Sequence, residues 1–598
     1  MEAPALVTVL DQTEIREQPG VNIDDRLRAI PGFTLFRRTS SVAANPTTQG
    51  VSLRGLGSSG ASRSLVLWDG IPVNDPFGSW VYWTRIAPDE LQRVELSRGA
   101  ATSLFGDRAM SGAISLFSRP AERFHVVGAY EGGNKNTHSL TGGFSHLWDR
   151  FGASALVRAF TTDGYYVVQE DRRGAVDTRA GVRFVSGVGR LDYIRTQDRL
   201  FVKLDVLTEE RANGTVLTRN SSNMGTLAGH YTRQWTNDAI SFLGYHTRQE
   251  YHASFSAVSA NRNVETITFL QSVPAEAVGG AGMWRRNARS WNLLAGADVQ
   301  RVEGTSTDAL ATGMFRIGGG SQLQHGTFAQ FDAGTSAAKL FLGARHQFTG
   351  TDSRFFSPSG GFALGRGLLR ARGSAYRAFR APTLNELFRD FRAGNTETRS
   401  NPALLPETLF GAEVGFDVVA ESAHLGVSLY RNQIDDVITN VTVSSTPQLI
   451  IRQRRNAAEA LTRGVDVQAD YRWRSWRLDL GYLFADSRFS TGERIPQVPK
   501  HAGNAQLTYA AADTLASVGF RSYSLQYEDD RNQFKLPGYG SLQFSARQRL
   551  KNSLWATVSL ENALDHVYLT GIPTPTAPTI GAPRLWRAGL RWDGPIRR

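Results

Sequence analysis

Cysteine is absent from this chain of 598 residues, lysine is rare, and there is no long apolar run. Without cysteine the chain has no disulfide framework, no zinc–thiolate site and no cysteine nucleophile. No apolar segment approaches the roughly 20 residues that a transmembrane helix needs. A transmembrane β-barrel remains open, because each of its strands needs only about 10 residues and shows lipid one face.

Arginine supplies almost all of the positive charge. Only six of the 67 basic residues are lysine, and the formal net charge is +12. The arginines are spread along the chain and form no single basic stripe, which argues against a dedicated nucleic-acid site. Two explanations of the excess stay open: a genome that favours arginine codons, and attraction to an anion such as a lipopolysaccharide phosphate or an acidic ligand.

The signatures of common enzyme classes are also missing. The sequence holds no G-x-S-x-G elbow, H-E-x-x-H helix or P-loop. Its histidines are scattered, without the spacing of metal ligands. Carboxylates are plentiful, so a catalytic pair stays open, but nothing singles one out. We therefore predict no enzyme, no metal site and no cofactor.

The first 120 residues predict a compact mixed α/β unit. A helical stretch at 23–30 is stopped by Pro31 and Gly32, and a second short helix is expected at 88–92. Short β runs and a turn complete the unit, at 51–53, 64–68 and Asp69-Gly70.

From about Phe124 to Trp592 the chain repeatedly alternates apolar and polar residues. In 464–473, the odd positions from Val465 to Trp473 are apolar, and the even positions are glycine, charged or amide residues. Such alternation marks strands with one apolar and one polar face. The same pattern recurs at 412–418, 477–484 and 586–592.

The alternating runs number about 22 to 24, and the links between them differ in length. Short links are expected at 149–150, 198 and 551–552, and long ones at 211–224, 304–323, 389–406, 489–499 and 570–581. Short turns on one side and long loops on the other are typical of a transmembrane barrel. A soluble sandwich also alternates, but it rarely has so many sequential strands.

Two further features favour the barrel. Aromatic residues sit near strand ends, where interfacial girdles form: Trp473, Trp476, Tyr527, Trp555 and Trp592. A barrel of this size has a wet lumen too wide for side chains to fill. We predict a transmembrane β-barrel of about 22 antiparallel strands at 122–598, with residues 1–121 as an α/β plug inside it.

Several ordered motifs resemble those of TonB-dependent outer-membrane receptors over nearly the whole chain. In the plug these are L-R-A-I-P-G-F at 27–33, V-S-L-R-G at 51–55, V-L-W-D-G-I-P at 66–72, 93–106 and 111–115. In the barrel they are A-Y-R-A-F-R-A-P-T-L-N-E-L at 375–387, N-P-A-L-L-P-E at 401–407, R-G-V-D at 463–466 and L-E-N-A-L-D at 560–565. The family's energy-coupling box has no convincing copy before Val7.

The resemblance implies a receptor in the outer membrane of a Gram-negative type of bacterium. It would import a scarce solute actively, a ferric siderophore or a cobalamin-like chelate, using energy from a TonB-ExbB-ExbD type complex. The expected surroundings are lipopolysaccharide and outer-membrane lipid, the barrel is expected to be monomeric, and no nucleic acid is expected to bind. Receptors for an oligosaccharide, a peptide or another metal chelate remain alternatives, as does a passive porin.

The resemblance also implies two groups of functional residues. Charged plug residues would face barrel carboxylates, with surface solvation as the alternative: Arg54, Arg93, Glu95 and Arg98 in the plug, and Glu407, Glu413 and Asp466 in the barrel. Substrate contacts are expected from two plug apices: Arg37, Arg38 and Asn45 in one, and Phe77, Trp80, Tyr82 and Trp83 in the other. Arginine forks suit an anionic ligand. The aromatics could stack on a ligand or pack against the barrel wall.

Overall fold

The computed structural model describes residues 4–57, 60–99, 102–350, 353–393, 396–446, 449–456, 459–573 and 577–595. Ala100 and Ala101, within the motif at 93–106, lie outside the described residues. No helix in these ranges is long and apolar enough to cross a membrane.

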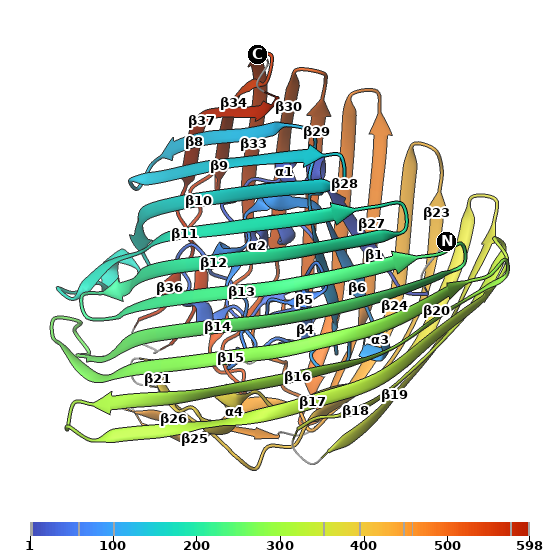
Figure 1. The fold of residues 1–598 in the computed structure, drawn as a ribbon. Coiled ribbons are helices and arrows are strands. Elements are labelled where there is room, and N and C mark those ends of the chain that lie inside the picture. Colours follow the sequence, from blue (N-terminus) through green and yellow to red (C-terminus); the bar gives the residue numbers. More distant parts are fainter. Residues whose placement is uncertain are drawn as a thin grey trace.

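In the described part of the chain, 22 antiparallel strands close into one barrel (Figure 1). Each strand pairs with its neighbour along the chain, and the last, β37, pairs with the first, β8. The strands are β8 His125–Gly133, β9 Thr137–Trp148, β10 Phe151–Tyr166, β11 Asp177–Ile194, β12 Asp198–Thr215, β13 Arg219–Gln234, β14 Asp238–Val258, β15 Glu265–Asn287, β16 Trp291–Leu310, β17 Phe315–Gly334, β18 Ala338–Phe348, β19 Arg354–Arg366, β20 Leu369–Arg380, β23 Glu407–Val419, β24 Ala423–Asp435, β27 Ala460–Trp473, β28 Trp476–Phe489, β29 His501–Ala510, β30 Thr514–Tyr523, β33 Tyr539–Lys551, β34 Leu554–Glu561 and β37 Leu585–Gly594.

The apolar face of each strand points outward. On β27, Tyr471 and Trp473 are more than half exposed, whereas Asp466 of the polar face is completely buried. On β28, Leu480 and Tyr482 are exposed in the same way. The predicted two-faced strands thus form a cylinder whose lipid-facing side is apolar and whose inner side is polar.

Two of the predicted long links are wrong. The segment 211–224 is mostly strand, because β12 runs to Thr215 and β13 starts at Arg219. Likewise 304–323 is mostly strand, interrupted only between Leu310 and Phe315. These four strands have 16 to 20 residues, far more than the roughly 10 that span a bilayer. Past the membrane both faces meet water, so the apolar alternation fades while the backbone pairing continues.

Of the other predicted long links, 389–406 and 570–581 carry short strands, whereas 489–499 has no helix or strand after Phe489, where β28 ends. The link before β23 contains a helix and two strands, and later links contain further β pairs. The elements are α4 Leu384–Phe388, β21 Phe391–Ala393, β22 Thr396–Arg399, β25 Ile438–Ser445, β26 Ile450–Asn456, β31 Gln526–Tyr527, β32 Lys535–Leu536, β35 Leu569–Gly571, β36 Thr579–Ile580 and η4 Glu170–Arg172.

The N-terminal residues form a separate unit inside the barrel, drawn in blue in Figure 1. Its main sheet has the order β1-β6-β7-β4-β5, with β1 and β5 at the edges. Its elements are β1 Val7–Asp11, α1 Gln12–Glu17, α2 Ile23–Leu27, β2 Phe33–Leu35, η1 Pro46–Thr48, β3 Val51–Leu53, β4 Ser64–Trp68, β5 Ile71–Pro72, η2 Trp83–Arg85, η3 Pro88–Glu90, β6 Leu91–Arg98, α3 Thr102–Phe105 and β7 Gly112–Ser118.

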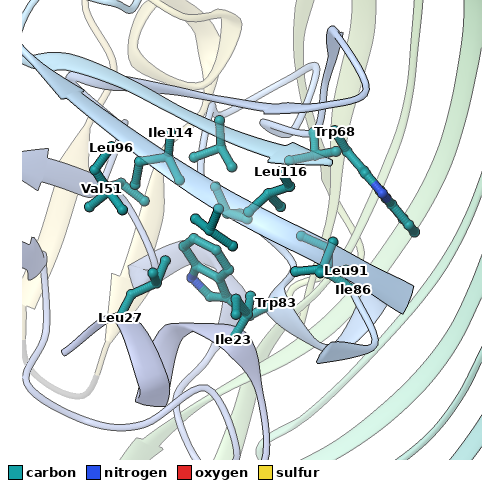
Figure 2. Close-up of a cluster of buried hydrophobic side chains, with 14 of the residues drawn as sticks. Ile23, Leu27, Val51, Trp68, Trp83, Ile86, Leu91, Leu96, Ile114 and Leu116 are labelled. Carbon is teal, nitrogen blue, oxygen red and sulfur yellow. The ribbon is translucent and has the colours of Figure 1, made fainter. Parts of the chain in front are cut away.

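The helix predicted at 88–92 is wrong. Pro88–Glu90 make a single 3-10 turn, and β6 begins at Leu91. The segment forms a strand and not a helix because Val94 and Leu96 alternate into the core of the plug, and an irregularity between Leu91 and Arg93 lets Leu91 reach the same core. Figure 2 shows these side chains packed with Trp83, Ile114 and their neighbours from the helices and the sheet. The plug therefore has an apolar core of its own.

Candidate functional site: the plug, its ion pairs and its outward loops

A turn after β3 carries Arg54 into the barrel wall. Arg54 and Gly55 both have positive φ, of 52° and 72°. Gly55 is needed here because a Cβ on it would lie 2.9 Å from the Cβ of Ala485 on β28. The R-G segment of the sequence thus lets the plug backbone approach the barrel closely.

Arg54 and Arg98 meet two barrel carboxylates in a buried cluster. Arg54 pairs with Glu413 on β23, and its Nε lies 3.3 Å from Oδ2 of Asp466 on β27. Arg98 Nε lies 3.4 Å from the same Asp466 oxygen. Burial alone would lower the pKa of Arg54, but Glu413 and Asp466 outweigh it and hold that pKa above its ordinary value. The structure therefore brings four of the seven predicted charged residues together.

The other predicted carboxylate, Glu407, belongs to a second cluster. Its partner in the plug is Arg63, whose Nε donates to Glu407 at 3.0 Å. On the barrel side, Arg380 donates to Glu407 at 2.6 Å and to Glu386 at 2.9 Å. All four side chains are buried. Arg380 and Glu386 were not among the predicted site residues. Both lie in the motif at 375–387, and that motif could have identified them.

Arg93 and Glu95 stand apart from both clusters. They lie two positions apart on β6 and so on one face of it, where they pair with each other at 2.8 Å. The Arg93 side chain is 45 % exposed and covers the ring of Phe117. Among the described residues neither forms an ion pair with a charged residue of the barrel. Both are placed at the plug surface and not at the barrel wall.

Further buried pairs join the plug to other parts of the wall. Arg85 pairs with Asp205 on β12. Asp69 accepts from Lys203, also on β12, at 2.7 Å. Glu17 pairs with Arg477 on β28. No sequence pattern marks these barrel residues, because each is one polar position among many on an inward face.

The first predicted apex is largely occupied by protein partners. Arg38 is buried, contacts Gln526 through Nε, and donates through Nη1 to the carbonyl of Pro537 at 3.0 Å. Arg37 pairs with Glu528 in the loop after β30 but keeps 22 % of its side chain exposed. Asn45 is partly exposed and caps η1 by accepting from Thr47 N at 3.1 Å.

The aromatics of the second apex are all buried, with at most 2 % exposed. Trp83 lies in the plug core, 6.0 Å from Phe33 in an edge-to-face contact. Phe77, Trp80 and Tyr82 pack against apolar residues of the barrel wall. In this structure they make the packing contacts that were the alternative to ligand stacking.

The arrangement is suited to a plug that stays seated yet can yield. Ion pairs orient the plug at several points around the wall, and each can exchange its partner for water. Among the described residues no group of three or more His, Asp or Glu side chains is placed to hold a metal ion.

Comparison with known proteins agrees with this architecture. The model of the TonB-dependent receptor plug domain matches residues 1–113, and that of the TonB-dependent receptor-like β-barrel matches residues 123–563. The chain is 22 % identical to the vitamin B12 transporter BtuB of Vibrio vulnificus (strain YJ016), over 98 % of this chain and 92 % of that protein. It is 23 % identical to the ferrienterobactin receptor of Escherichia coli (strain K12), over 98 % and 89 %.

The fold is also that of a solved structure described as the copper transporter OprC. The TM-score is 0.83, at 15 % identity, over 98 % of this chain and 99 % of that one. The family models cover both the plug and most of the barrel. The chain therefore belongs to the TonB-dependent receptors, the plugged β-barrels of the bacterial outer membrane.

Proposed function

We propose that this receptor imports a metal chelate, a ferric siderophore or a cobalamin-like compound, with energy from a TonB-ExbB-ExbD type complex. The observation that carries the proposal is the plug, which lies inside the closed barrel and is fixed by buried ion pairs to β12, β23, β27 and β28. A plug fixed in this way would obstruct diffusion through a passive porin. An energy-driven importer needs one that can be displaced.

The topology of the plug sheet supports a pulling mechanism. β1 lies at the sheet edge, and among the described residues it pairs with β6 alone, through five residue pairs from Val7 to Asp11. A force applied ahead of Val7 would load this single ladder first. Because the bonds of an edge strand can be broken one after another, β1 is the part of the plug that gives way most easily.

The ligand class rests on relatives and on two plug residues. The two curated relatives compared above are named for vitamin B12 and ferrienterobactin. Of the seven substrate candidates, Arg37 and Asn45 are the two that keep partial exposure. We assign ligand contact to these two, and assign the buried aromatics to holding the apex in place.

Uptake in a Gram-negative host that lacks its own siderophore and cobalamin receptors tests the proposal. Cells expressing the chain should accumulate a radiolabelled ferric catecholate chelate or radiolabelled cobalamin only when TonB is present. Arg37→Gln should weaken uptake, while Arg93→Gln, which changes an exposed pair on β6, should not. Uptake of neither chelate, but of an oligosaccharide or peptide, would favour the other receptor classes. Equal uptake without TonB would favour a porin.

A further inference from the structure

A polar cavity of about 130 Å³ lies between the plug and the barrel wall. The plug lines it with residues around α1 and α2 and with Pro88 and Asp89. The barrel lines it with strands on both sides of the β37–β8 closure. A polar space of this size holds several waters or one small oxyanion.

Arginine dominates the lining of this cavity. Six guanidinium groups surround it: Arg16, Arg26, Arg158, Arg547, Arg587 and Arg591. In the described part of the chain, only four carboxylates lie within ion-pair distance of any of them: Asp89, Glu131, Glu561 and Asp593. Counted over these ion pairs alone, the six arginines outnumber their carboxylates by two.

All four carboxylates form their ion pairs with Arg16, Arg587 or Arg591. Arg591 Nη1 lies 2.9 Å from Asp89, and Arg16 Nη2 lies 3.0 Å from Asp593. Arg587 is more loosely paired, at 3.7 Å from Glu561. In the described structure these pairs leave the other three arginines without a carboxylate within ion-pair distance.

The other three arginines have no carboxylate partner within the described ranges. Arg26 Nη1 donates to the carbonyl of Ile15 at 2.6 Å, and its Nε is buried without a hydrogen-bond acceptor. Arg158 Nη2 donates to the carbonyl of Val21 at 2.8 Å. Arg547 lies 5.5 Å from the ring of Trp555, and its buried Nε also has no acceptor.

Two further carboxyls on the plug, Glu17 and Asp25, have other partners. Glu17 pairs with Arg477, as described above. Asp25 accepts a hydrogen bond from the backbone N–H of Asn22 at 3.5 Å. Neither forms an ion pair with an arginine of the cavity in the described structure.

Such a concentration of like charge is unfavourable when it is buried. Burial, and then the neighbouring Arg591, lower the pKa of Arg16 to about 10. Burial lowers the pKa of Arg26 as well. Buried charges with unfilled donors are normally compensated by a counter-charge. A negatively charged ligand in the cavity would supply both the charge and the missing acceptors.

We propose that this cavity is an anion site that binds a small oxyanion, with inorganic phosphate as its model ligand. Arg26 would approach it from the plug, and Arg158 and Arg547 from the barrel. Because the donors come from both units, the bound anion bridges them and helps to hold the plug in its seated position. The inference concerns plug seating and does not depend on which solute the receptor imports.

Calorimetric titration of the full chain in detergent with inorganic phosphate, at constant ionic strength, tests the site. The unaltered protein should bind phosphate saturably, and Arg547→Gln should bind it at least tenfold more weakly. Arg549→Gln is the matched control, because Arg549 lies on the same strand but is exposed and pairs with Asp513. Absence of saturable binding by the unaltered protein would overturn the proposal, as would equal binding by Arg547→Gln.

Protease cleavage of the plug provides a second measurement that does not rely on heat of binding. Phosphate should slow cleavage severalfold in the unaltered protein and in Arg549→Gln, and have no such effect in Arg547→Gln. Chloride at the same ionic strength should protect much less, since it screens charge without bridging several donors. Equal protection by chloride would show simple screening and would also overturn the proposal. Heat-modified migration of the barrel in gels checks that each variant is folded.

Discussion

At Arg54 a single guanidinium joins two barrel strands to the plug, in surroundings that exclude nearly all solvent. An ion pair of this kind adds little net stability when it is intact, because both charges lose their water. It is costly to break on one side only, because the remaining charge is then buried alone. The plug is therefore held in one orientation by contacts that must be released together.

The pair of Arg85 and Asp205 offers a simple test of this view, since it involves one plug residue and one barrel carboxylate. Arg85→Asp would place two carboxylates face to face and should weaken plug seating by roughly 3–5 kcal/mol. The double variant Arg85→Asp with Asp205→Arg should recover part of that loss. Conductance in planar bilayers and protease access to the plug measure the effect.

Arg93→Asp serves as the control for this exchange. Its pair with Glu95 is exposed, so the change should cost about 0–1 kcal/mol. A double variant that leaks as much as the worse single variant would contradict the expected pairing.

Asp75 predicts a pH dependence within the plug. Burial raises its pKa to about 6, and the hydrogen bond that it accepts from Gly78 N opposes this only in part. The unfolded chain, with a pKa near 3.9, binds fewer protons between about pH 4 and pH 6. Plug stability should therefore fall as the pH rises through this range, by at most about 3 kcal/mol, and level off above it.

Asp75→Asn keeps the acceptor oxygen but cannot titrate, so it should flatten this slope. Tryptophan fluorescence during urea unfolding at several pH values reports the change, because Trp80 lies in the same loop. A slope unchanged in Asp75→Asn would assign the pH dependence to other groups.

At the scale of the strand, the governing feature is the division into two faces. Side chains that point outward contact lipid, and side chains that point inward contact the plug or water. Adjacent residues on one strand therefore lie in apolar and polar surroundings in turn. On β28, Leu480 faces outward, while Leu483, three positions further along, faces inward and is buried. The same substitution should therefore have different effects at nearby positions.

Leu480→Arg should destabilise the barrel by roughly 2–4 kcal/mol, because it puts a charge on the lipid face. The site lies about 13 Å along β28 from Trp476, one of the aromatic residues expected at the membrane boundary. Leu564→Arg is the control, since Leu564 is 70 % exposed in the loop after β34. Urea titration of the protein folded into lipid vesicles measures both. Equal stability of the two variants would place Leu480 outside the bilayer.

At the scale of the whole molecule, the plug and the closed barrel are joined by many contacts but only one covalent connection. β7 ends at Ser118 and β8 begins at His125, so the plug is tethered through this short link. Any import that requires the plug to move must separate it from the wall. A covalent bond elsewhere between the two units should therefore stop import.

A disulfide between Ser103→Cys and Ser359→Cys would provide that bond. The two hydroxyls are 3.0 Å apart, one on α3 of the plug and the other on β19 of the barrel. The chain has no native cysteine to interfere. Oxidised cells should lose energy-dependent uptake, and a reductant should restore it.

The control disulfide joins Thr137→Cys and Thr162→Cys, whose hydroxyls are 2.8 Å apart on the neighbouring barrel strands β9 and β10. It should leave uptake unchanged, because it ties the wall to itself. Full uptake by the oxidised Ser103–Ser359 variant would show that import proceeds without separation at α3.

Some features of the fold and the site follow from local sequence, and these were predicted. The alternation at 464–473 indicates which face of β27 contacts lipid, because the side chains on the lipid-facing side are apolar. The hairpins at 211–224 and 304–323 were missed because strands in water need no apolar face.

A two-faced, many-stranded barrel follows from the period of apolar residues along the chain, and the α/β plug from its short helix, strand and turn signals. Which charges meet depends on the tertiary structure. Arg54 and Asp466 are 412 positions apart, and Arg85 and Asp205 are 120 apart. Their pairing depends on how the barrel closes and how the plug is turned within it, which no local pattern encodes. The same holds for the arginine cavity, whose lining comes from both ends of the chain and meets only where β37 joins β8.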